Sequence, residues 1–417
     1  MNITSKDRLL RSLNHQESDR ISIDFGSTSV TGIHCRIVEE LRRYYGLEKR
    51  PVRIIEPFQM LGEVDEELQK IMSVDTAGVF GRLDMFSIDE TQLHEQITPW
   101  GQHVLMAKEI DLTPDKDGNV YIYPEGDRSI APSAVMPANC FFINAIERGT
   151  EVDDESLAAA DNLEEFGHIS EADLDYYAQA VDQAATTGKA VVASFGGTAL
   201  GDIAFVPGMG LKQPKGIRSV AEWYMSTIMR PDYIQEIFER QIDLAIENYR
   251  LLWERLGDKV DVVFTCGTDF GTQNSQFCSN ETFSELWLPY YKRMNDWIHQ
   301  HTSWKVFKHC CGSIVPIIPL MIEAGFDILN PVQINAKDMD PQRLKNEFGR
   351  YLTFWGGGID TQRILPSASP AEVKEHVLRQ CEIFGRDGGF VFNSVHNIQA
   401  NVPVANVVAM IEALNTL

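Results

Sequence analysis

Hydrophobic and β-branched residues gather in short runs that recur through the second half of the chain. The runs lie at 190–195, 260–264, 304–309, 326–330, 351–355 and 389–393. Each run is typical of a buried strand. Segments with apolar residues at helical spacing lie between them, at 279–300, 314–323, 341–348 and 370–384. Such alternation predicts a parallel sheet with helices packed outside it.

The first third of the chain follows a less regular pattern. An amphipathic run at 7–13, preceded by Ser5, predicts an N-terminal helical segment, and apolar alternation at 20–25 predicts the strand after it. Residues 99–138 carry aromatic and β-branched runs separated by Gly-containing turns, which predicts a β-hairpin insertion. We expect residues 1–417 to form one domain that carries this insertion.

Two α/β architectures fit this alternation, a closed (β/α)₈ TIM barrel and an open, doubly wound sheet. Gly, Asp, His and Asn residues directly after several predicted strands favour the barrel, because strand ends converge at one face of that fold. The sequence has no G-x-G-x-x-G segment after an early strand, no phosphate-binding G-x-x-x-x-G-K-S/T loop and no G-x-S-x-G elbow. Dinucleotide binding, nucleotide hydrolysis and serine esterase chemistry therefore lack their usual motifs.

Charge and hydropathy narrow the classes of partner. Lys and Arg total 37 against 60 Asp and Glu, which gives a formal charge of −23. This charge repels phosphate backbones and anionic lipid surfaces, so we expect no nucleic acid and no membrane partner. No stretch reaches the ~20 apolar residues of a membrane span, and no apolar segment follows Met1. We therefore expect a cytoplasmic protein that acts on a small-molecule substrate.

The sharpest chemical motif is His309-Cys310-Cys311-Gly312, at the end of a predicted strand. Side chains alternate along a strand, so His309 and Cys311 project to the same side. Imidazole nitrogen and thiolate sulfur are ligands of zinc, and a catalytic zinc site needs three protein ligands. His396 follows the last predicted strand and is the candidate third ligand, although it could instead hydrogen-bond a substrate or a loop. The seven cysteines form no regular disulfide framework.

Four other polar residues follow predicted strands and are candidate site residues. Asp269 is the candidate catalytic residue, as a general base, a further ligand or a cation anchor, or it caps its loop. Gln333 and Asn397 are candidate substrate-binding amides, although loop amides usually satisfy the local backbone. Asp360, after a Gly-rich turn, is a third substrate-binding candidate or the N-cap of the next helical turn.

Taken in order, these segments resemble the uroporphyrinogen decarboxylase superfamily over nearly the whole chain. The resemblance rests on residues 4–20, 308–313, 323–327, 330–333, 357–362 and 396–399. It implies a (β/α)₈ barrel. The superfamily includes tetrapyrrole decarboxylases and zinc-dependent methyltransferases that act with corrinoid proteins.

This sequence departs from the motif of each branch of the superfamily at one place. The decarboxylases carry a segment of the form F/W-M-R-Q-A-G-R near the first strand, whereas residues 23–30 here read I-D-F-G-S-T-S-V, without arginine. Substrate carboxylates would lack their charge-assisted partners. The methyltransferase branch carries H-x-C, matched by His309 and Cys311, and a later cysteine that His396 replaces. One thiolate fewer makes a bound zinc a stronger Lewis acid.

The expected function is therefore a zinc-dependent methyltransferase that moves a methyl group between a small methylated substrate or thiol and a corrinoid (cobalamin). No corrinoid-binding segment is evident, so the corrinoid is expected on a partner protein. The alternatives are a decarboxylase-like lyase on a small acid or tetrapyrrole, and a non-catalytic barrel that binds a tetrapyrrole or a corrinoid protein.

Overall fold

The computed structural model describes residues 3–149, 151–196 and 198–417. Within them, eight strands form one sheet in the order β1, β16, β15, β14, β13, β12, β11, β5, and the neighbours pair in parallel. These strands are β1 Ser22–Ile23, β5 Thr76–Val79, β11 Ala190–Ser194, β12 Val262–Cys266, β13 Lys305–His309, β14 Ile328–Asn330, β15 Thr353–Trp355 and β16 Phe390–Phe392.

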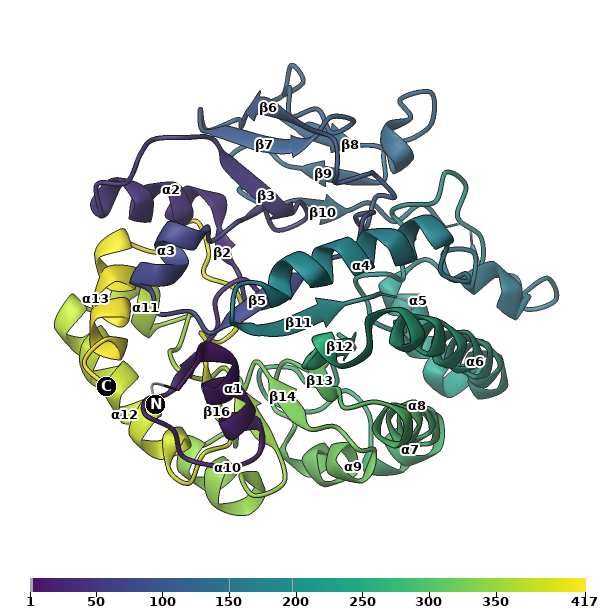
Figure 1. Cartoon of the computed structure of the whole chain (residues 1–417). Helices are drawn as coiled ribbons and strands as arrows, with labels where there is room; N and C mark the ends of the chain where they lie inside the picture. The colour runs from purple at the N-terminus through teal and green to yellow at the C-terminus, as the bar shows by residue number, and fades with distance from the viewer. Residues whose placement is uncertain (1–2, 150, 197) are drawn as a thin grey trace.

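The two edge strands of this sheet meet and close it into a cylinder. The backbone N–H of Asp75, just before β5, donates to the carbonyl of Ile23 in β1 at 2.8 Å. The Asp75 carboxylate in turn accepts from the Ile23 N–H at 3.0 Å. Helices surround the cylinder (Figure 1). The predicted (β/α)₈ TIM barrel is confirmed, and the open sheet is excluded.

The helices follow the predicted alternation, with one difference. The segment predicted as a single helix at 279–300 is divided at Trp287, because Pro289, the second residue of the next helix, has no N–H to continue the previous one. The helices are α1 Ser5–Leu13, α2 Cys35–Tyr44, α3 Glu66–Ile71, α4 Glu171–Ala185, α5 Val220–Met229, α6 Pro231–Leu256, α7 Asn280–Leu286, α8 Leu288–His301, α9 Ile318–Glu323, α10 Pro341–Phe348, α11 Ile364–Ser367, α12 Pro370–Gly385 and α13 Val404–Leu414.

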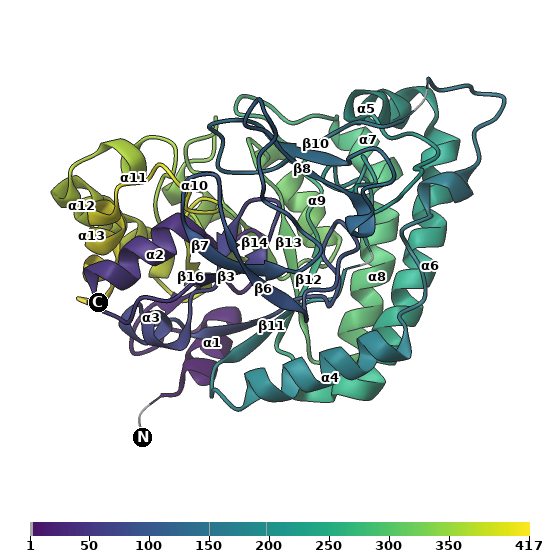
Figure 2. The ribbon, with the colours of Figure 1, turned by 90° about the horizontal axis from the view of Figure 1, so that it is seen from above.

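Helix α1 closes one end of the barrel. The Thr4 side chain caps it by accepting from the Asp7 N–H, and Leu9 and Leu13 pack into the barrel interior. The strand residues of this interior cluster are Ala190, Val192, Val262, Phe307, Ile328, Trp355 and Val391. Figure 2 shows α1 at one end and α5 and β10 at the other. The strands' carboxyl ends are therefore left to form the site.

Two small sheets lie beside the barrel (Figure 1). Their orders are β2-β4-β3-β7-β6 and β10-β9-β8, with β2 Ile33–His34, β3 Val52–Glu56, β4 Leu61–Gly62, β6 Leu93–Ile97, β7 His103–Ala107, β8 Val120–Ile122, β9 Ala134–Met136 and β10 Asn144–Ala145. The region predicted as a hairpin insertion, 99–138, contains β7, β8 and β9, and the antiparallel pairs are β6 with β7 and β8 with β9. Among the helices of the described residues, none has the length and apolar character that crossing a membrane requires.

Candidate metal centre

His309 is the last residue of β13, and the adjacent strands fix its orientation. Its Nδ1 lies 2.6 Å from Asn330 Oδ1 at the end of β14, and Asn330 Nδ2 donates to the Trp355 carbonyl at 2.8 Å. The carbonyl can only accept, so the Asn330 amide presents its oxygen to His309. His309 Nδ1 therefore carries the proton, and its Nε2 lone pair is free for a ligand.

Cys311 lies two residues beyond β13, where two loops pack tightly. A Cβ on Gly312 would lie 2.3 Å from the Gly271 backbone, and Gly312 has φ +93°. Only glycine permits this approach. The Cys311 Sγ lies 3.4 Å from His309 Nε2. The backbone N–H of Cys311 donates to Asp269 Oδ1 at 2.6 Å. The two loops thus place the thiol beside the free nitrogen of His309.

His396 comes from the loop after β16, on the other side of the mouth. Its φ of +63° lies in the left-handed region. Non-glycine residues adopt this region rarely, and those that do are often found at functional sites. The Ser394 hydroxyl donates to the His396 carbonyl at 2.6 Å, and the Asn397 N–H donates to His396 Nδ1 at 2.8 Å. These contacts leave Nε2 of His396 as the ring nitrogen that faces the site.

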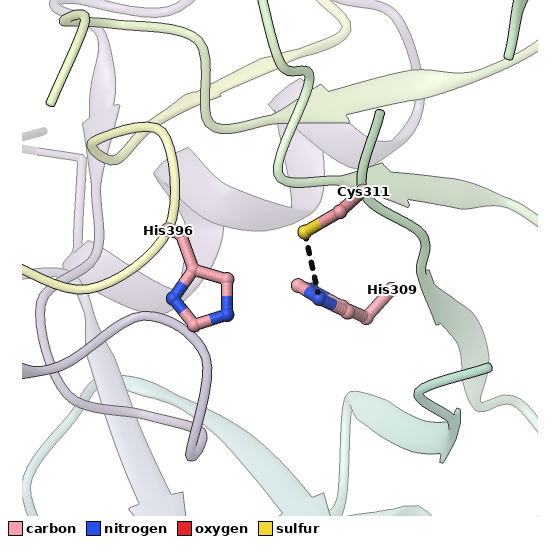
Figure 3. Close-up of side chains that lie close together, drawn as sticks. All are labelled: His309, Cys311 and His396. Carbon is pink, nitrogen blue, oxygen red and sulfur yellow. Dashed lines mark hydrogen bonds between the residues drawn. The ribbon is translucent and has the colours of Figure 1, made fainter. Parts of the chain in front are cut away.

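The structure brings His309, Cys311 and His396 together (Figure 3). One ligand atom from each lies within 4.8 Å of the other two, and the two imidazole centroids are 5.2 Å apart. Two imidazoles and one thiolate are a borderline-soft donor set that suits zinc, and three protein donors leave a position open for substrate. The donor set predicted from sequence therefore has a geometry that fits a metal ion.

Burial keeps both imidazoles neutral, the charge state that metal binding requires. It lowers the pKa of His309 to about 4 and that of His396 to about 3, against an ordinary value of 6.5. Both are neutral at physiological pH. Burial, with the charge of Asp269 added, raises the pKa of Cys311 well above the ordinary range. The metal-free site thus holds a protonated thiol, and a cation there would favour its deprotonation.

Asp269, the predicted catalytic residue, lies at the same mouth. Its Oδ1 is 3.7 Å from His309 Nε2 and also accepts the Cys311 N–H. Burial raises the pKa of its carboxyl, and the Cys311 N–H and the Lys308 charge act against this shift. The side chain is 25% exposed. Asp269 therefore both holds the Cys311 backbone and presents a carboxylate to the site.

The three predicted substrate-binding residues use their polar groups within the protein. Gln333 Oε1 accepts from the Gly312 N–H at 2.7 Å. Asp360 Oδ1 accepts from the N–H groups of Gln362 and Arg363, as an N-terminal cap does. The Asn397 amide accepts from the Gly32 N–H and donates to the Ser29 carbonyl and to Gln59. These contacts support the loops around the site, and direct substrate contact by the three residues stays a prediction.

Two residues at the mouth carry no signal in the sequence. Asp202 and Tyr224 belong to the long connection between β11 and α6, which contains no motif. Burial raises the pKa of Tyr224 most, and the charges of Asp269 and Asp202 raise it further. Only the three-dimensional fold brings these side chains close to Asp269.

The fold and the site define a class of barrel protein whose side chains with ligand chemistry gather at the carboxyl ends of the strands. The chain belongs to the uroporphyrinogen decarboxylase (URO-D) family, whose model matches residues 155–417. The family resemblance inferred from the sequence is confirmed.

Solved structures are similar to this chain at low sequence identity. A methyltransferase from Methanosarcina mazei is similar over 100% of this chain and 99% of its own, with a TM-score of 0.55 and 13% identity. Endo-glycoceramidase II from Rhodococcus sp. is similar over 72% of this chain and 80% of its own, with a TM-score of 0.38 and 12% identity. No curated protein sequence gives a match.

Proposed function

We propose that this protein is a zinc-dependent methyltransferase that moves a methyl group between a heteroatom of a small substrate and the cobalt of a corrinoid on a separate protein. The observation that carries the proposal is the convergence of His309, Cys311 and His396 within 4.8 Å at the mouth of the barrel. The M. mazei methyltransferase, whose structure aligns with this whole chain, supports it.

His309, Cys311 and His396 would hold the metal. A bound Zn²⁺ supplies a Lewis acid that can coordinate a substrate heteroatom at the open position. The residues of the chain prepare that position: Asn330 keeps the His309 Nε2 lone pair free, and burial keeps both imidazoles neutral. Asp269 Oδ1, 3.7 Å from His309 Nε2, is placed to accept a proton from a substrate thiol or hydroxyl.

The loop after β1 favours methyl transfer over tetrapyrrole decarboxylation. The Asp24 carboxylate is buried there, and it accepts from the hydroxyls of Ser27 and Thr76 and from the Trp355 indole N–H. These side chains satisfy one another within the barrel. The loop presents no guanidinium that could bind the several carboxylates of a uroporphyrinogen.

Two measurements test the proposal. Metal analysis of protein purified without chelator should find close to one zinc per chain, since three convergent donors retain zinc through mild dialysis. In a transfer assay with methylcobalamin as donor and a panel of small thiols and alcohols as acceptors, the absorbance of methylcobalamin should decrease with time. Removal of zinc should stop this decrease. Zinc-free protein, or transfer at the same rate after zinc removal, would overturn the proposal.

A further inference from the structure

Asp202 is a buried carboxylate at the mouth that the metal centre does not use. Asp202 follows β11 in the chain, and 9% of its surface is exposed. A Cβ on Gly267 would lie 2.4 Å from Asp202 Oδ2, so the carboxylate packs against the backbone two residues before Asp269. Asp202 Oδ1 accepts from the Ala204 N–H at 3.0 Å.

Asp202 and Asp269 are two neighbouring carboxylates without a cationic partner. Among the described residues, no lysine or arginine forms a salt bridge with either; Asp269 pairs only with His309, which is neutral. The charge of buried Lys308 acts on both carboxylates, but its Nζ donates to the Thr268 carbonyl at 2.6 Å. Burial and the charge of Asp269 raise the pKa of Asp202 to about 6. An unpaired buried carboxylate is costly, so a cation entering this site is stabilised.

An aromatic pair borders the same place. Tyr224 of α5 stacks on Phe277, with ring centroids 4.9 Å apart and an interplanar angle of 23°. The Tyr224 hydroxyl is buried and has no hydrogen-bond partner within the part of the chain that the structure describes. The Phe277 N–H donates at 2.7 Å to the carbonyl of Phe270, the residue that follows Asp269, so the aromatic pair lies beside the Asp269 loop. Burial, and after it the charges of Asp269 and Asp202, raises the pKa of Tyr224. Phe277 is 48% exposed and leaves ring surface open to a ligand.

We infer that Asp202, Asp269, Tyr224 and Phe277 bind a cationic nitrogen of the substrate beside the metal centre. Carboxylates attract an ammonium group by charge, aromatic faces attract it through their quadrupole, and the free Tyr224 hydroxyl can accept one of its N–H groups. The inference rests on the proposed function and names its substrate class. The substrate is a small molecule with an amine at one end and, at the other, the heteroatom that gains or loses the methyl group.

Three probes of equal length and different charge test this inference on the full chain as purified. They are propylammonium, 1-propanol and propionate, and they are titrated with a metal chelator present, because a carboxylate could otherwise bind zinc at the neighbouring metal centre. Dissociation constants from saturation-transfer NMR titrations should show propylammonium bound about tenfold more tightly than 1-propanol, with propionate weakest. Propionate binding as tightly as propylammonium would overturn the inference.

Asp202→Asn should reduce the preference for propylammonium over 1-propanol, because it removes one of the two carboxylate charges and keeps the shape of the side chain. The matched control is Asp117→Asn, which neutralises an exposed carboxylate between β7 and β8 and should keep the preference. If Asp202→Asn fails to fold, Phe277→Leu provides a second test, since it removes an exposed ring and should weaken propylammonium binding several-fold. Unchanged preference in a folded Asp202→Asn, or unchanged affinity in Phe277→Leu, contradicts the inference.

The two proposals fail in different ways. Zinc retention and methyl transfer by a protein that does not prefer propylammonium would overturn the substrate class and leave the proposed function standing. A clear preference for propylammonium in a protein without zinc and without methyl transfer would overturn the proposed function. The cation site would then belong to a different reaction.

Discussion

The Asn330 amide oxygen lies 2.6 Å from His309 Nδ1, and the amide nitrogen of the same residue donates to the Trp355 carbonyl. Three adjacent strand ends, of β13, β14 and β15, are linked by these two hydrogen bonds. The barrel sheet itself therefore sets the tautomer of His309. Hydrogen bonds of this kind orient metal-binding imidazoles and increase their basicity.

Asn330→Ala should lower zinc affinity by about tenfold to a hundredfold, since His309 loses the acceptor that fixes its ring. Asn330→Asp should retain more of the affinity, because a carboxylate oxygen can still accept from Nδ1. Competition with a chromophoric zinc chelator measures both variants. Equal affinity in wild type and Asn330→Ala would show that the hydrogen bond does not support a metal ligand.

Asp269→Asn should reduce methyl transfer by at least about a hundredfold, as expected when a proton acceptor is lost, and should change the melting temperature little. The Asn oxygen can still accept the Cys311 N–H, so the loop contact survives and only the charge is lost. Asp269→Ala removes that contact as well and should also destabilise the fold. If Asp269→Asn unfolds at ordinary temperature, the carboxylate is structural and our assignment is wrong.

Much of the barrel was predictable because buried parallel strands are nearly continuous apolar runs, as at 304–309 and 389–393. Strand β5 escaped prediction because Gly78 interrupts its pattern of apolar and β-branched residues. A Cβ on Gly78 would lie 2.6 Å from the Ser27 carbonyl oxygen, so the fold requires glycine where a strand pattern calls for a large residue. A contact between distant segments determines that residue, and local periodicity does not show it.

The candidate metal ligands could be predicted because they follow strand ends that are visible in the sequence, whereas the residues of the proposed cation site could not. His309 and Cys311 share one strand end, so their spacing is visible in the sequence, and His396 follows another strand whose end meets the same face. Asp202 lies in the long connection between β11 and α6, and Tyr224 lies on α5, the helix within that connection. Their approach to Asp269 depends on how that connection folds over the barrel.

Lys308→Met should destabilise the protein by about 1–3 kcal/mol, because the buried Thr268 carbonyl loses its donor. Lys308 is fully buried, and its ammonium also lies over the Phe270 and Tyr291 rings. Urea titrations measure the free energy of unfolding of Lys308→Met and of the control Lys292→Met. The control changes an exposed helical position and should lower that free energy by less than about 0.5 kcal/mol. Equal stability of the two variants would contradict this role of Lys308.

His34 should make stability depend on pH. Burial lowers its pKa to about 4 from 6.5, while its Nε2 donates to the Phe141 carbonyl and its Nδ1 accepts the Arg36 N–H. The native state therefore resists protonation more than the unfolded chain. The contribution of neutral His34 to the free energy of unfolding is fully present above pH 6.5 and is lost as the pH falls toward about 4. His34→Gln should lose less unfolding free energy between neutral pH and pH about 4 than wild type does, as measured by urea titrations. Parallel losses in the two proteins would exclude this contribution.

His396 lies where the family resemblance implies a cysteine in the methyltransferase branch. In the metal-free protein its Nδ1 accepts the Asn397 N–H, so the neutral ring carries its proton on Nε2, the atom that faces the site. Zinc coordination by Nε2 must move that proton to Nδ1 and open the contact with Asn397. We therefore expect the Asn397 backbone amide resonance to shift when zinc is added.

If His396 is the third ligand, His396→Ala should lose zinc much as Cys311→Ala does, because the two remaining donors cannot hold a tetrahedral site. His396→Cys should retain zinc, since a thiolate replaces the imidazole, and its greater electron donation should shift preference from alcohols toward thiols in the methyl-transfer assay. Bound zinc measured in the three variants and in wild type separates the cases. Zinc loss confined to Cys311→Ala would remove His396 from the ligand set. Asp269, whose Oδ1 is 3.7 Å from His309 Nε2, would then be the donor in position to complete the site.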